Sequence, residues 1–365
     1  MKKIMLVFGT RPEAIKMCPL VNELKKEKEF DVKVCVTGQH REMLSQVLNC
    51  FSIVPDYDLN IMKERQTLFD VTVNILDKIK NVLEKSKPDI VLVHGDTTTT
   101  FVTSLACFYL GIKIGHVEAG LRTYNINSPF PEEFNRQAVS IISDYNFAPT
   151  EQSKQNLINE GKDSSKIYVT GNTAIDALKT TVVDNYSNPI LDWAKDSKLI
   201  LLTAHRRENL GENMKHMFIA IRKVVEEFSD VKVIYPIHMN PVVRKIASEI
   251  LNNHERIRII EPLDVLDFHN FMNHSFIILT DSGGIQEEAP ALGKPVLVMR
   301  DTTERPEGIK AGTLKLVGTS EDSIYNEFKN LIVNKDEYYK MSKACNPYGN
   351  GTACEHIRKI LKNNL

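Results

Sequence analysis

Short apolar runs alternate along the chain with polar loops and amphipathic stretches. In the first half, the runs that predict strands are Ile4–Phe8, Val32–Thr37, Ile90–His94, Ile114–Glu118 and Tyr145–Ala148. The stretches between them predict helices, among them Thr67–Glu84 and Thr97–Leu110. Uninterrupted apolar strands that alternate with helices are typical of parallel sheets covered by helices on both faces.

The same alternation starts again in the second half of the chain. Its predicted strands are Leu199–Thr203, Val233–Pro236, Ile257–Ile260, Phe276–Thr280 and Val296–Met299. The stretch 182–197 breaks the rhythm, because its Asn, Ser and Pro residues favour turns, and we expect the interdomain linker there. A second turn cluster, at 345–351, precedes a last helix.

This pattern predicts an α/β protein of two Rossmann-like, doubly wound lobes that face a central cleft. We expect the first lobe to span residues 1–180 and the second to span 181–351. The length of 365 residues agrees, since a single hydrophobic core rarely grows beyond about 250–300 residues. Ligands of such folds bind beyond the carboxyl ends of the strands.

Composition narrows the class of partner and the compartment. The formal net charge of −1 disfavours a nucleic-acid partner, which would call for a basic excess. No apolar run approaches the roughly 20 residues of a membrane span, and Gly9 ends the N-terminal run too early for a signal peptide. The six cysteines form no C-x-x-C pair, so we expect reduced core residues of a cytoplasmic protein.

The loop after the first predicted strand reads Gly9-Thr10-Arg11-Pro12-Glu13-Ala14-Ile15-Lys16. It lacks the G-x-G-x-x-G fingerprint, and the second strand ends without an acidic residue for a ribose, so a nicotinamide or flavin cofactor is disfavoured. Arg11 and Lys16 stand where a strand gives way to a helix, a position suited to anion contacts. The alternative is that both are solvated surface charges.

Three carboxylates follow strands of the first lobe. Asp96 comes after Ile90–His94, Glu118 ends the next run, and Glu132 lies in a proline-bounded loop before a helix. Asp96 or Thr97 could instead cap the following helix, and Glu132 and Glu133 could complement a helix N-terminus. Acids that converge on one pocket suit general acid–base chemistry better than either structural role.

Positive and donor groups follow strands of the second lobe. His205 and His238 each come just past a strand end, where a packed core histidine is the alternative. Neither belongs to a pair at metal-ligand spacing with a carboxylate, so we predict no metal site.

The segment Asp281–Glu288 leads a strand directly into a helix through Ser282-Gly283-Gly284. Glycines let a phosphate approach the backbone, and the helix start favours an anion. Glu288 lies one turn later and could accept ribose hydroxyls, while Arg305 is a candidate diphosphate clamp.

Taken together, these motifs resemble the non-hydrolysing UDP-N-acetylglucosamine 2-epimerases. The resemblance runs in order through residues 9–16, 94–100, 116–123, 131–133, 205–208, 281–290 and 300–307. It implies a glycosyltransferase-B type fold in which the last helix, 352–365, crosses back to the first lobe.

The resemblance also assigns residues. It implies that the catalytic groups are Asp96, Glu118, Glu132 and His205. The implied substrate contacts are Asp96, Glu118, Arg11, Lys16, His205, His238, Phe268, Ser282, Gly283, Gly284, Glu288 and Arg305. Some relatives bind a second substrate molecule as an activator, and the residues resembling that site are Gln39, His40, Arg65, Arg206 and His238.

The activity implied is the reversible conversion of UDP-N-acetylglucosamine to UDP-N-acetylmannosamine. UDP would leave to give a 2-acetamidoglucal and then add back, with no metal or redox cofactor, in a homodimer that supplies cell-surface polysaccharide. Three alternatives stay open: a hydrolysing epimerase, a glycosyltransferase of the same fold, and a non-catalytic nucleotide-sugar sensor.

Overall fold

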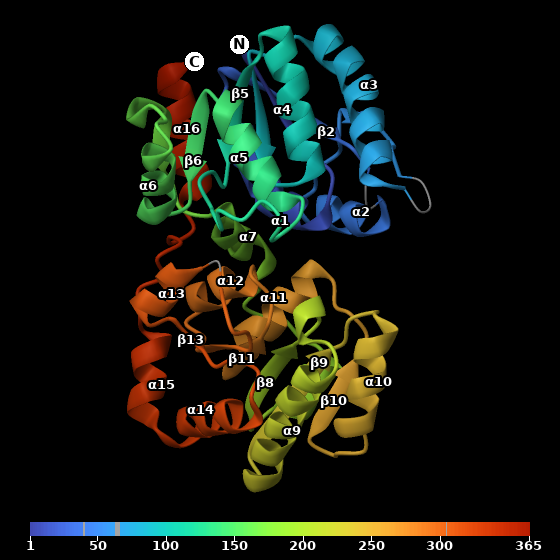
Figure 1. Cartoon of the computed structure of the whole chain (residues 1–365), viewed down its shortest axis with the longest axis vertical. Helices are drawn as coiled ribbons and strands as arrows, with labels where there is room; N and C mark the ends of the chain where they lie inside the picture. The colour runs from blue at the N-terminus through green and yellow to red at the C-terminus, as the bar shows by residue number, and fades with distance from the viewer. Residues whose placement is uncertain (39–40, 63–65, 304) are drawn as a thin grey trace. The chain divides into compact units, whose positions relative to one another are not determined.

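The computed structural model describes residues 1–38, 41–62, 66–303 and 305–365 (Figure 1). The chain forms two compact units, one made of residues 1–180 with 348–365 and the other of residues 181–347. Each unit contains one parallel sheet, so the predicted α/β class is confirmed.

The sheet of the first unit has the order β3-β2-β1-β4-β5-β6-β7, and its strand pairs are parallel. Its strands are β1 (Lys2–Phe8), β2 (Phe30–Val36), β3 (Tyr57–Asp58), β4 (Ile90–His94), β5 (Lys113–Val117), β6 (Tyr145–Ala148) and β7 (Ile167–Val169). The apolar pattern did not predict β3 and β7, because two or three residues are too few to show a period.

Helices cover both faces of this sheet. The helices of this unit are α1 (Arg11–Leu24), α2 (Arg41–Cys50), α3 (Leu68–Ser86), α4 (Thr98–Leu110), α5 (Glu132–Ile142), α6 (Glu151–Asn159), α7 (Thr173–Thr181) and α16 (Ala353–Asn364). Figure 1 shows α3, α4 and α5 side by side on one face. There Met5 and Val7 of β1 pack in one buried cluster with Ile75 and Ile79 of α3.

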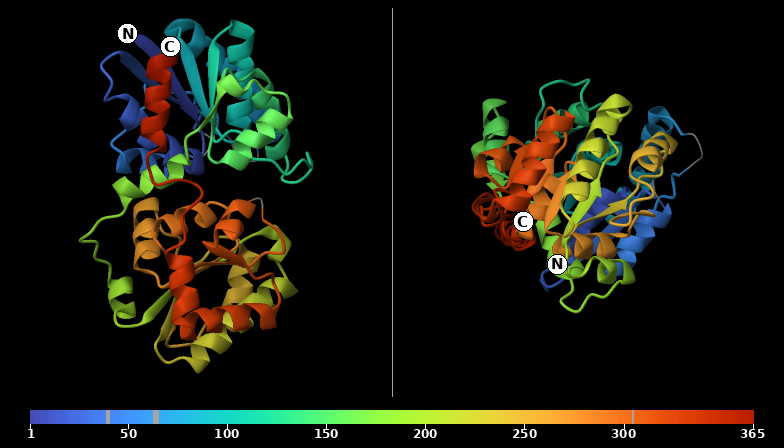
Figure 2. Two further views of the ribbon diagram at one scale, coloured as in Figure 1. Left: turned by 90° about the vertical axis from the view of Figure 1, so that its left-hand side faces the viewer. Right: turned by 90° about the horizontal axis from the view of Figure 1, so that it is seen from below.

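The last helix, α16, completes the first unit. Figure 2 (left) shows it in red against the blue N-terminal segments. Arg358 pairs with Glu23 of α1 at 2.9 Å and with Glu27 at 3.1 Å. Asp176 of α7 caps the start of α16, because its carboxylate accepts the N–H groups of residues 353 and 354 at 3.1 and 3.0 Å.

Residues 348–351, expected in the second lobe, belong to the first unit. The Asn172 N–H donates to the Tyr348 carbonyl at 2.8 Å, and Lys179 donates to the Gly351 carbonyl. The turn cluster therefore docks on α7 before α16 begins.

The sheet of the second unit has the order β10-β9-β8-β11-β12-β13, again with parallel pairs. Its strands are β8 (Lys198–Thr203), β9 (Val231–Pro236), β10 (Ile257–Ile260), β11 (Ile277–Thr280), β12 (Val296–Val298) and β13 (Leu314–Leu316). The short β13 was not predicted. In both sheets the first strand of the unit lies between its second and fourth, which is the topological switch point where doubly wound folds bind ligands.

The helices of the second unit are α8 (Pro189–Ala194), α9 (Glu212–Glu227), α10 (Pro241–Ile250), α11 (Val265–His274), α12 (Ile285–Ala291), α13 (Pro306–Ala311), α14 (Glu321–Val333) and α15 (Lys335–Ser342). The stretch 182–197, where the interdomain linker was expected, contains α8 and packs within this unit, which begins at residue 181. The Val183 N–H donates to Asn270 at 2.9 Å, and Trp193 lies under the Lys232 and Arg258 side chains.

Among the helices of the described residues, none is both long and apolar enough to cross a membrane. Of the cysteines, Cys18, Cys35, Cys107 and Cys354 are buried and Cys345 is exposed. Burial raises the pKa of the Cys35 and Cys107 thiols to about 12, which is the behaviour of inert core cysteines.

Candidate functional site

A buried carboxylate organises the loop between β1 and α1. Glu13 is 2% exposed and accepts the N–H groups of Gly9 and Thr10 at 3.0 and 2.8 Å, while Thr10 caps α1 in return. This is a capping box, and it fixes the direction in which α1 carries Lys16.

The other oxygen of Glu13 reaches the loop between β4 and α4. It accepts the Thr97 hydroxyl at 2.7 Å and the Thr100 hydroxyl at 3.4 Å. Burial raises the pKa of Glu13, and the bonds from Thr97, Gly9 and Thr10 act in the opposite direction. The loop before α1, the helix that carries Arg11 and Lys16, is thereby joined to the loop that carries Asp96.

Glu118 stands just past β5 and is surrounded by polar groups of the first unit. Its Oε2 lies 2.5 Å from Lys16 Nζ, 2.9 Å from Asn172 Nδ2 and 3.6 Å from His94 Nε2. Its φ of +67° is in the left-handed region, which is uncommon for a residue with a side chain. This backbone geometry, found at a predicted catalytic residue, aims the carboxylate back toward β4.

Asp96 does not cap α4, which was its structural alternative. Thr97 takes that role, because its hydroxyl accepts the Thr100 N–H at 3.1 Å. The Asp96 carboxylate instead pairs with Arg136 of α5 at 2.6 Å, and Asn135 donates to the Asp96 carbonyl at 2.8 Å. Two neighbouring residues of α5 therefore hold the acid in place.

Glu132 and Glu133 begin α5 but play different parts. Glu133 is fully buried and accepts the N–H groups of Thr123 and Tyr124, each at 3.0 Å, as well as a 3.1 Å contact from Arg136. It is a structural residue that ties the β5–α5 loop to the helix. Glu132, at the same helix start, is partly exposed. It lies on α5, the helix that contacts Asp96 through Arg136.

Two buried histidines support these acids. His116 donates through Nε2 to the Gly95 carbonyl at 2.7 Å, beside Asp96. Burial lowers the pKa of His94 to about 3 and that of His116 to about 4, although Glu118 and the Gly95 carbonyl respectively oppose the shift. Both rings are neutral near pH 7, and His94 faces Glu118 as an uncharged group.

In the second unit, Asp281 organises the loop after β8. Its buried carboxylate accepts the N–H groups of His205 and Arg206 at 2.9 and 2.8 Å, and the Asn209 amide at 3.2 Å. Asp281 begins the segment that the sequence predicts to be a diphosphate seat. In the structure its carboxylate holds the loop that carries the predicted site residues His205 and Arg206.

His205 and His238, from the loops after β8 and β9, stack with ring centroids 5.2 Å apart. Burial lowers the pKa of His205, and the Asp281 carboxylate 3.5 Å from its Nδ1 opposes that shift. The structure thus brings together two histidines that lie far apart in the sequence.

The Ser-Gly-Gly turn leads from β11 into α12 as predicted. The Ser282 N–H donates to the Thr280 hydroxyl at 2.9 Å, so it is engaged within the turn. Gly284 has helical φ and ψ, and a Cβ placed on it would meet only Glu288 Oε1, at 3.8 Å. The backbone of Gly284 is therefore open to a close approach by a ligand.

Glu288 and Phe268 lie on α12 and α11. Glu288 Oε2 is 3.7 Å from Nε2 of the buried His269, whose Nδ1 is 2.6 Å from the Thr181 hydroxyl. Phe268 precedes His269 and is half-buried. Both predicted nucleotide contacts thus belong to neighbouring helices of one unit.

Arg305 is almost completely buried rather than extended into solvent. Its Nε donates to Glu287 of α12 at 2.5 Å, and its N–H donates to Thr303 at 3.2 Å. Thr303 in turn donates to Gln286 at 2.7 Å. The guanidinium is thereby fixed beside the same helix that follows the Ser-Gly-Gly turn.

The predicted activator site is only partly covered by the structure. Gln39, His40 and Arg65 lie outside the described residues. Arg206 and His238 lie within the described residues. Arg206 follows His205 in the sequence, and the His238 ring stacks on the His205 ring.

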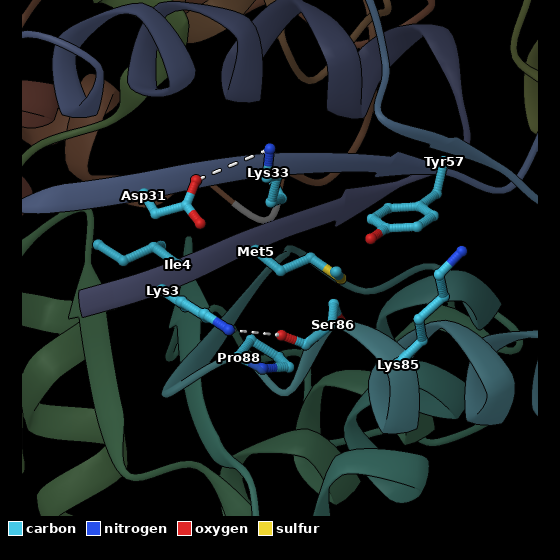
Figure 3. Close-up of a pocket in the computed structure, with 9 residues that line it drawn as sticks. All are labelled: Lys3, Ile4, Met5, Asp31, Lys33, Tyr57, Lys85, Ser86 and Pro88. Atoms are coloured by element: carbon cyan, nitrogen blue, oxygen red, sulfur yellow. Dashed lines mark hydrogen bonds and ion pairs between the residues drawn. The ribbon is translucent and has the colours of Figure 1, made fainter. Parts of the chain in front are cut away.

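A separate cavity of about 240 Å³ lies in the first unit. Figure 3 shows its lining, which includes Lys3 and Met5 of β1, Asp31 and Lys33 of β2, and Tyr57. It lies along the amino-terminal parts of the strands, whereas the predicted residues follow the carboxyl ends. Within the described ranges, no group of three His, Cys, Asp or Glu side chains is arranged to hold a metal ion.

Four residues near the predicted site were not predicted from the sequence, namely Glu13, Arg136, Asn172 and His269. Glu13 was read only as part of a loop motif, and nothing in its spacing reveals burial. Asn172 follows the unpredicted β7, so its place at a strand end was hidden. The signal for Arg136 was its spacing from Glu133, since residues three apart share a helix face.

The two doubly wound units, with polar side chains gathered past their strand ends, define a protein of the glycosyltransferase-B type. The chain belongs to the UDP-N-acetylglucosamine 2-epimerase family. The family model described as UDP-N-acetylglucosamine 2-epimerase matches residues 22–362. A Bacillus subtilis protein named UDP-N-acetylglucosamine 2-epimerase is 63% identical over 355 residues, covering 97% of this chain and 93% of that protein.

Solved structures agree with this assignment. A putative UDP-N-acetylglucosamine 2-epimerase from Listeria monocytogenes matches with a TM-score of 0.94 and 56% identity, covering 100% of this chain and 96% of that one. The UDP-GlcNAc 2-epimerase from Neisseria meningitidis, bound to UDP-GlcNAc, matches with a TM-score of 0.92 and 51% identity, covering 99% and 100%.

The depressed pKa values of His94 and His116 predict a pH-dependent stability. The unfolded chain binds protons near pH 6.5, but the folded rings do so only near 3 and 4. Their contribution is therefore present above pH 6.5 and is lost as the pH falls. As the pH falls from 7 to 5, we expect each of the two histidines to lower the free energy of unfolding by on the order of 2 kcal/mol.

Urea denaturation followed by far-UV circular dichroism at pH 5, 6 and 7 measures this loss. The His116→Gln variant removes one titrating ring, so its stability should fall less steeply with pH than that of the wild type. Equal slopes for the two proteins would show that His116 is not held neutral.

Proposed function

We propose that this chain interconverts UDP-N-acetylglucosamine and UDP-N-acetylmannosamine without hydrolysis, by eliminating UDP and adding it back through a 2-acetamidoglucal. The observation that carries the proposal is the Glu118 carboxylate, held by Lys16 at 2.5 Å and Asn172 at 2.9 Å past a strand end. Family membership and the Neisseria relative with bound UDP-GlcNAc support the choice of substrate.

The chemistry explains why elimination is needed. The hydrogen at C2 of the sugar is poorly acidic, because no carbonyl stands beside it. Departure of the diphosphate builds positive charge at C1 and makes that hydrogen removable. The enzyme must therefore supply a base near C2 and stabilise the leaving diphosphate.

The first unit supplies the acid–base groups in this proposal. Glu118 and Asp96 are the leading pair for removing and returning the C2 proton on opposite faces, with Glu132 as the third acid. Lys16 pairs with the Glu118 carboxylate at 2.5 Å, and Arg136 pairs with the Asp96 carboxylate at 2.6 Å, so a cation holds each acid in place.

The second unit holds the nucleotide in this proposal. The Ser282 side chain and the backbone at Gly283 and Gly284, together with Arg305, bind the diphosphate, and Arg11 is a further proposed substrate contact. Glu288 accepts ribose hydroxyls, Phe268 contacts the nucleotide, and His205 with His238 completes the site. Asp281 holds the loop that carries His205, and Glu287 holds the Arg305 guanidinium. Both contacts support these roles, because donors that are already fixed need no reorganisation when charge develops on the leaving group.

A hydrolysing epimerase and a glycosyltransferase would share the nucleotide contacts. The acids of the first unit favour epimerisation over transfer, because transfer to an acceptor needs no base at C2. We propose that the product supplies cell-surface polysaccharide and that the enzyme requires no metal or redox cofactor. A second UDP-N-acetylglucosamine, near Gln39, His40, Arg65, Arg206 and His238, is proposed as an activator.

Incubation with UDP-N-acetylglucosamine in heavy water, without an acceptor, tests this function. We expect UDP-N-acetylmannosamine at a minority equilibrium share, deuterium at C2 and little free UDP. Stoichiometric UDP release would indicate hydrolysis.

The Glu118→Gln variant should bind UDP but lose at least about 100-fold in turnover, since general base catalysis contributes roughly 10²–10⁴-fold. The exposed Glu151→Gln is the control and should match the wild type.

Gly284→Ala tests the diphosphate seat. The residue already has helical φ and ψ, and the new methyl group meets only Glu288 at 3.8 Å, so the melting temperature should stay within a few degrees. The methyl group would, however, stand where the diphosphate approaches. We expect the Kd for UDP by calorimetry to rise at least about tenfold, or 1.4 kcal/mol. An unchanged Kd in a stable variant would place the diphosphate elsewhere.

A homodimer is proposed through the face formed by α3, α4 and α5. Each of the three helices carries exposed apolar side chains, namely Phe69 (84% exposed), Val73 (63%), Phe108 (57%), Tyr109 (69%) and Ile141 (71%). Figure 1 shows the three helices side by side. Apolar surface that is exposed in the single chain is what contact with a second copy would bury.

Light scattering after size exclusion measures the oligomeric state. Ile141→Asp should convert a wild-type dimer to a monomer, because it places a charge in an apolar contact. Val333→Asp changes an apolar residue of the second unit that is 57% exposed, and should leave the dimer intact. A dimer in both variants would contradict this interface.

A further inference from the structure

We propose that Asn172 is a positioning residue that orients the Glu118 carboxylate for the reaction at C2. The inference rests on the proposed function and extends it to a side chain in the loop between β7 and α7. Asn172 is 3% exposed, and its Nδ2 donates to Glu118 Oε2 at 2.9 Å across 54 residues of sequence.

Two donors meet on the same carboxylate oxygen. Lys16 Nζ approaches Glu118 Oε2 at 2.5 Å from α1, while Asn172 approaches it from the β7–α7 loop. A carboxylate with one donor can still turn about its last torsion, which is broad for a terminal planar group. Donors from two separate elements restrict that rotation and fix the plane of the group.

The amide of Asn172 is itself held in one orientation. Its Oδ1 accepts the Ala174 N–H at 2.9 Å, so the amino group must point toward Glu118. A flipped amide would set an amino group against an N–H donor and an oxygen against a carboxylate. The backbone N–H of Asn172 also donates to the Tyr348 carbonyl at 2.8 Å. Asn172 is therefore fixed before substrate binds.

Lys16 and Asn172 have different consequences for the reaction. Lys16 is charged and is also a predicted substrate contact, so the substrate competes with Glu118 for its ammonium. Asn172 is neutral, and its bond to Glu118 persists whether or not Lys16 turns to a phosphate. The amide thus keeps the base aligned during the step in which the leaving group departs, when small misplacements are costly.

Asn172→Asp separates positioning from a purely structural role. The substituted side chain keeps the acceptor for the Ala174 N–H and the backbone bond to Tyr348. It removes the donor to Glu118 and places a second carboxylate beside it. A like charge disfavours ionisation of Glu118, so the acidic limb of the pH profile of kcat should move to higher pH.

The rate of C2 deuterium incorporation is measured for each variant from pH 5 to 9. For Asn172→Asp we expect kcat at pH 7 to fall about 10- to 100-fold, with KM within about threefold of the wild type. Asn172→Ser keeps a short acceptor but cannot reach Glu118, and should lose kcat without the shift in pH profile. Asn22→Asp, which removes an amide donor to the Phe51 carbonyl in the same unit, is the matched control and should behave as wild type.

Melting temperatures within a few degrees of the wild type confirm that each variant is folded. If Asn172→Asp is unstable, Asn172→Ser decides the question through its kcat. Turnover within twofold of the wild type, with an unchanged pH profile, would overturn the inference. A wild type that incorporates no deuterium would instead refute the proposed function, so the two failures are distinguishable.

Discussion

The arrangement of the first unit depends on the buried carboxylate of Glu13. It lies between two loops that leave neighbouring strands, β1 and β4, and it accepts hydrogen bonds from both. Without it, the N–H groups of Gly9 and Thr10 would be buried with no acceptor, a cost of about 1–3 kcal/mol each. Because these bonds join the start of α1, the helix that carries Lys16, to the loop that carries Asp96, the cap of one helix also sets the separation of these two predicted site residues.

The second unit meets the same requirement with a different residue. Asp281, at the end of β11, accepts two backbone N–H groups from the loop after β8, and that loop carries His205 and Arg206. In each sheet a buried acid from one strand end or helix start holds the polar loop of its neighbour. Polar loops at a sheet edge have few apolar contacts to order them. Buried carboxylates that accept the backbone N–H groups of these loops order them instead.

The sequence predicted the sheets well, because buried parallel strands are continuous apolar runs. Ile90–His94, Tyr145–Ala148 and Ile257–Ile260 were predicted to the residue. The strands that were missed are two or three residues long, and Asn172 was missed with β7. Burial and pairing were also invisible: nothing local shows that Lys16 would meet Glu118, 102 positions later. Such contacts come from the topology, which brings distant strand ends to one edge.

The return of the chain through Tyr348 has a consequence for how the protein is made. The first unit is closed by α16, whose Ile357 and Leu361 are fully buried, and α16 is synthesised only after the whole second unit. Residues 1–180 therefore leave the ribosome with the apolar surface that α16 later covers still exposed. The order of synthesis makes completion of the first unit wait for the second, so an interruption anywhere before α16 leaves both the acids and their supporting loops on an unfinished core.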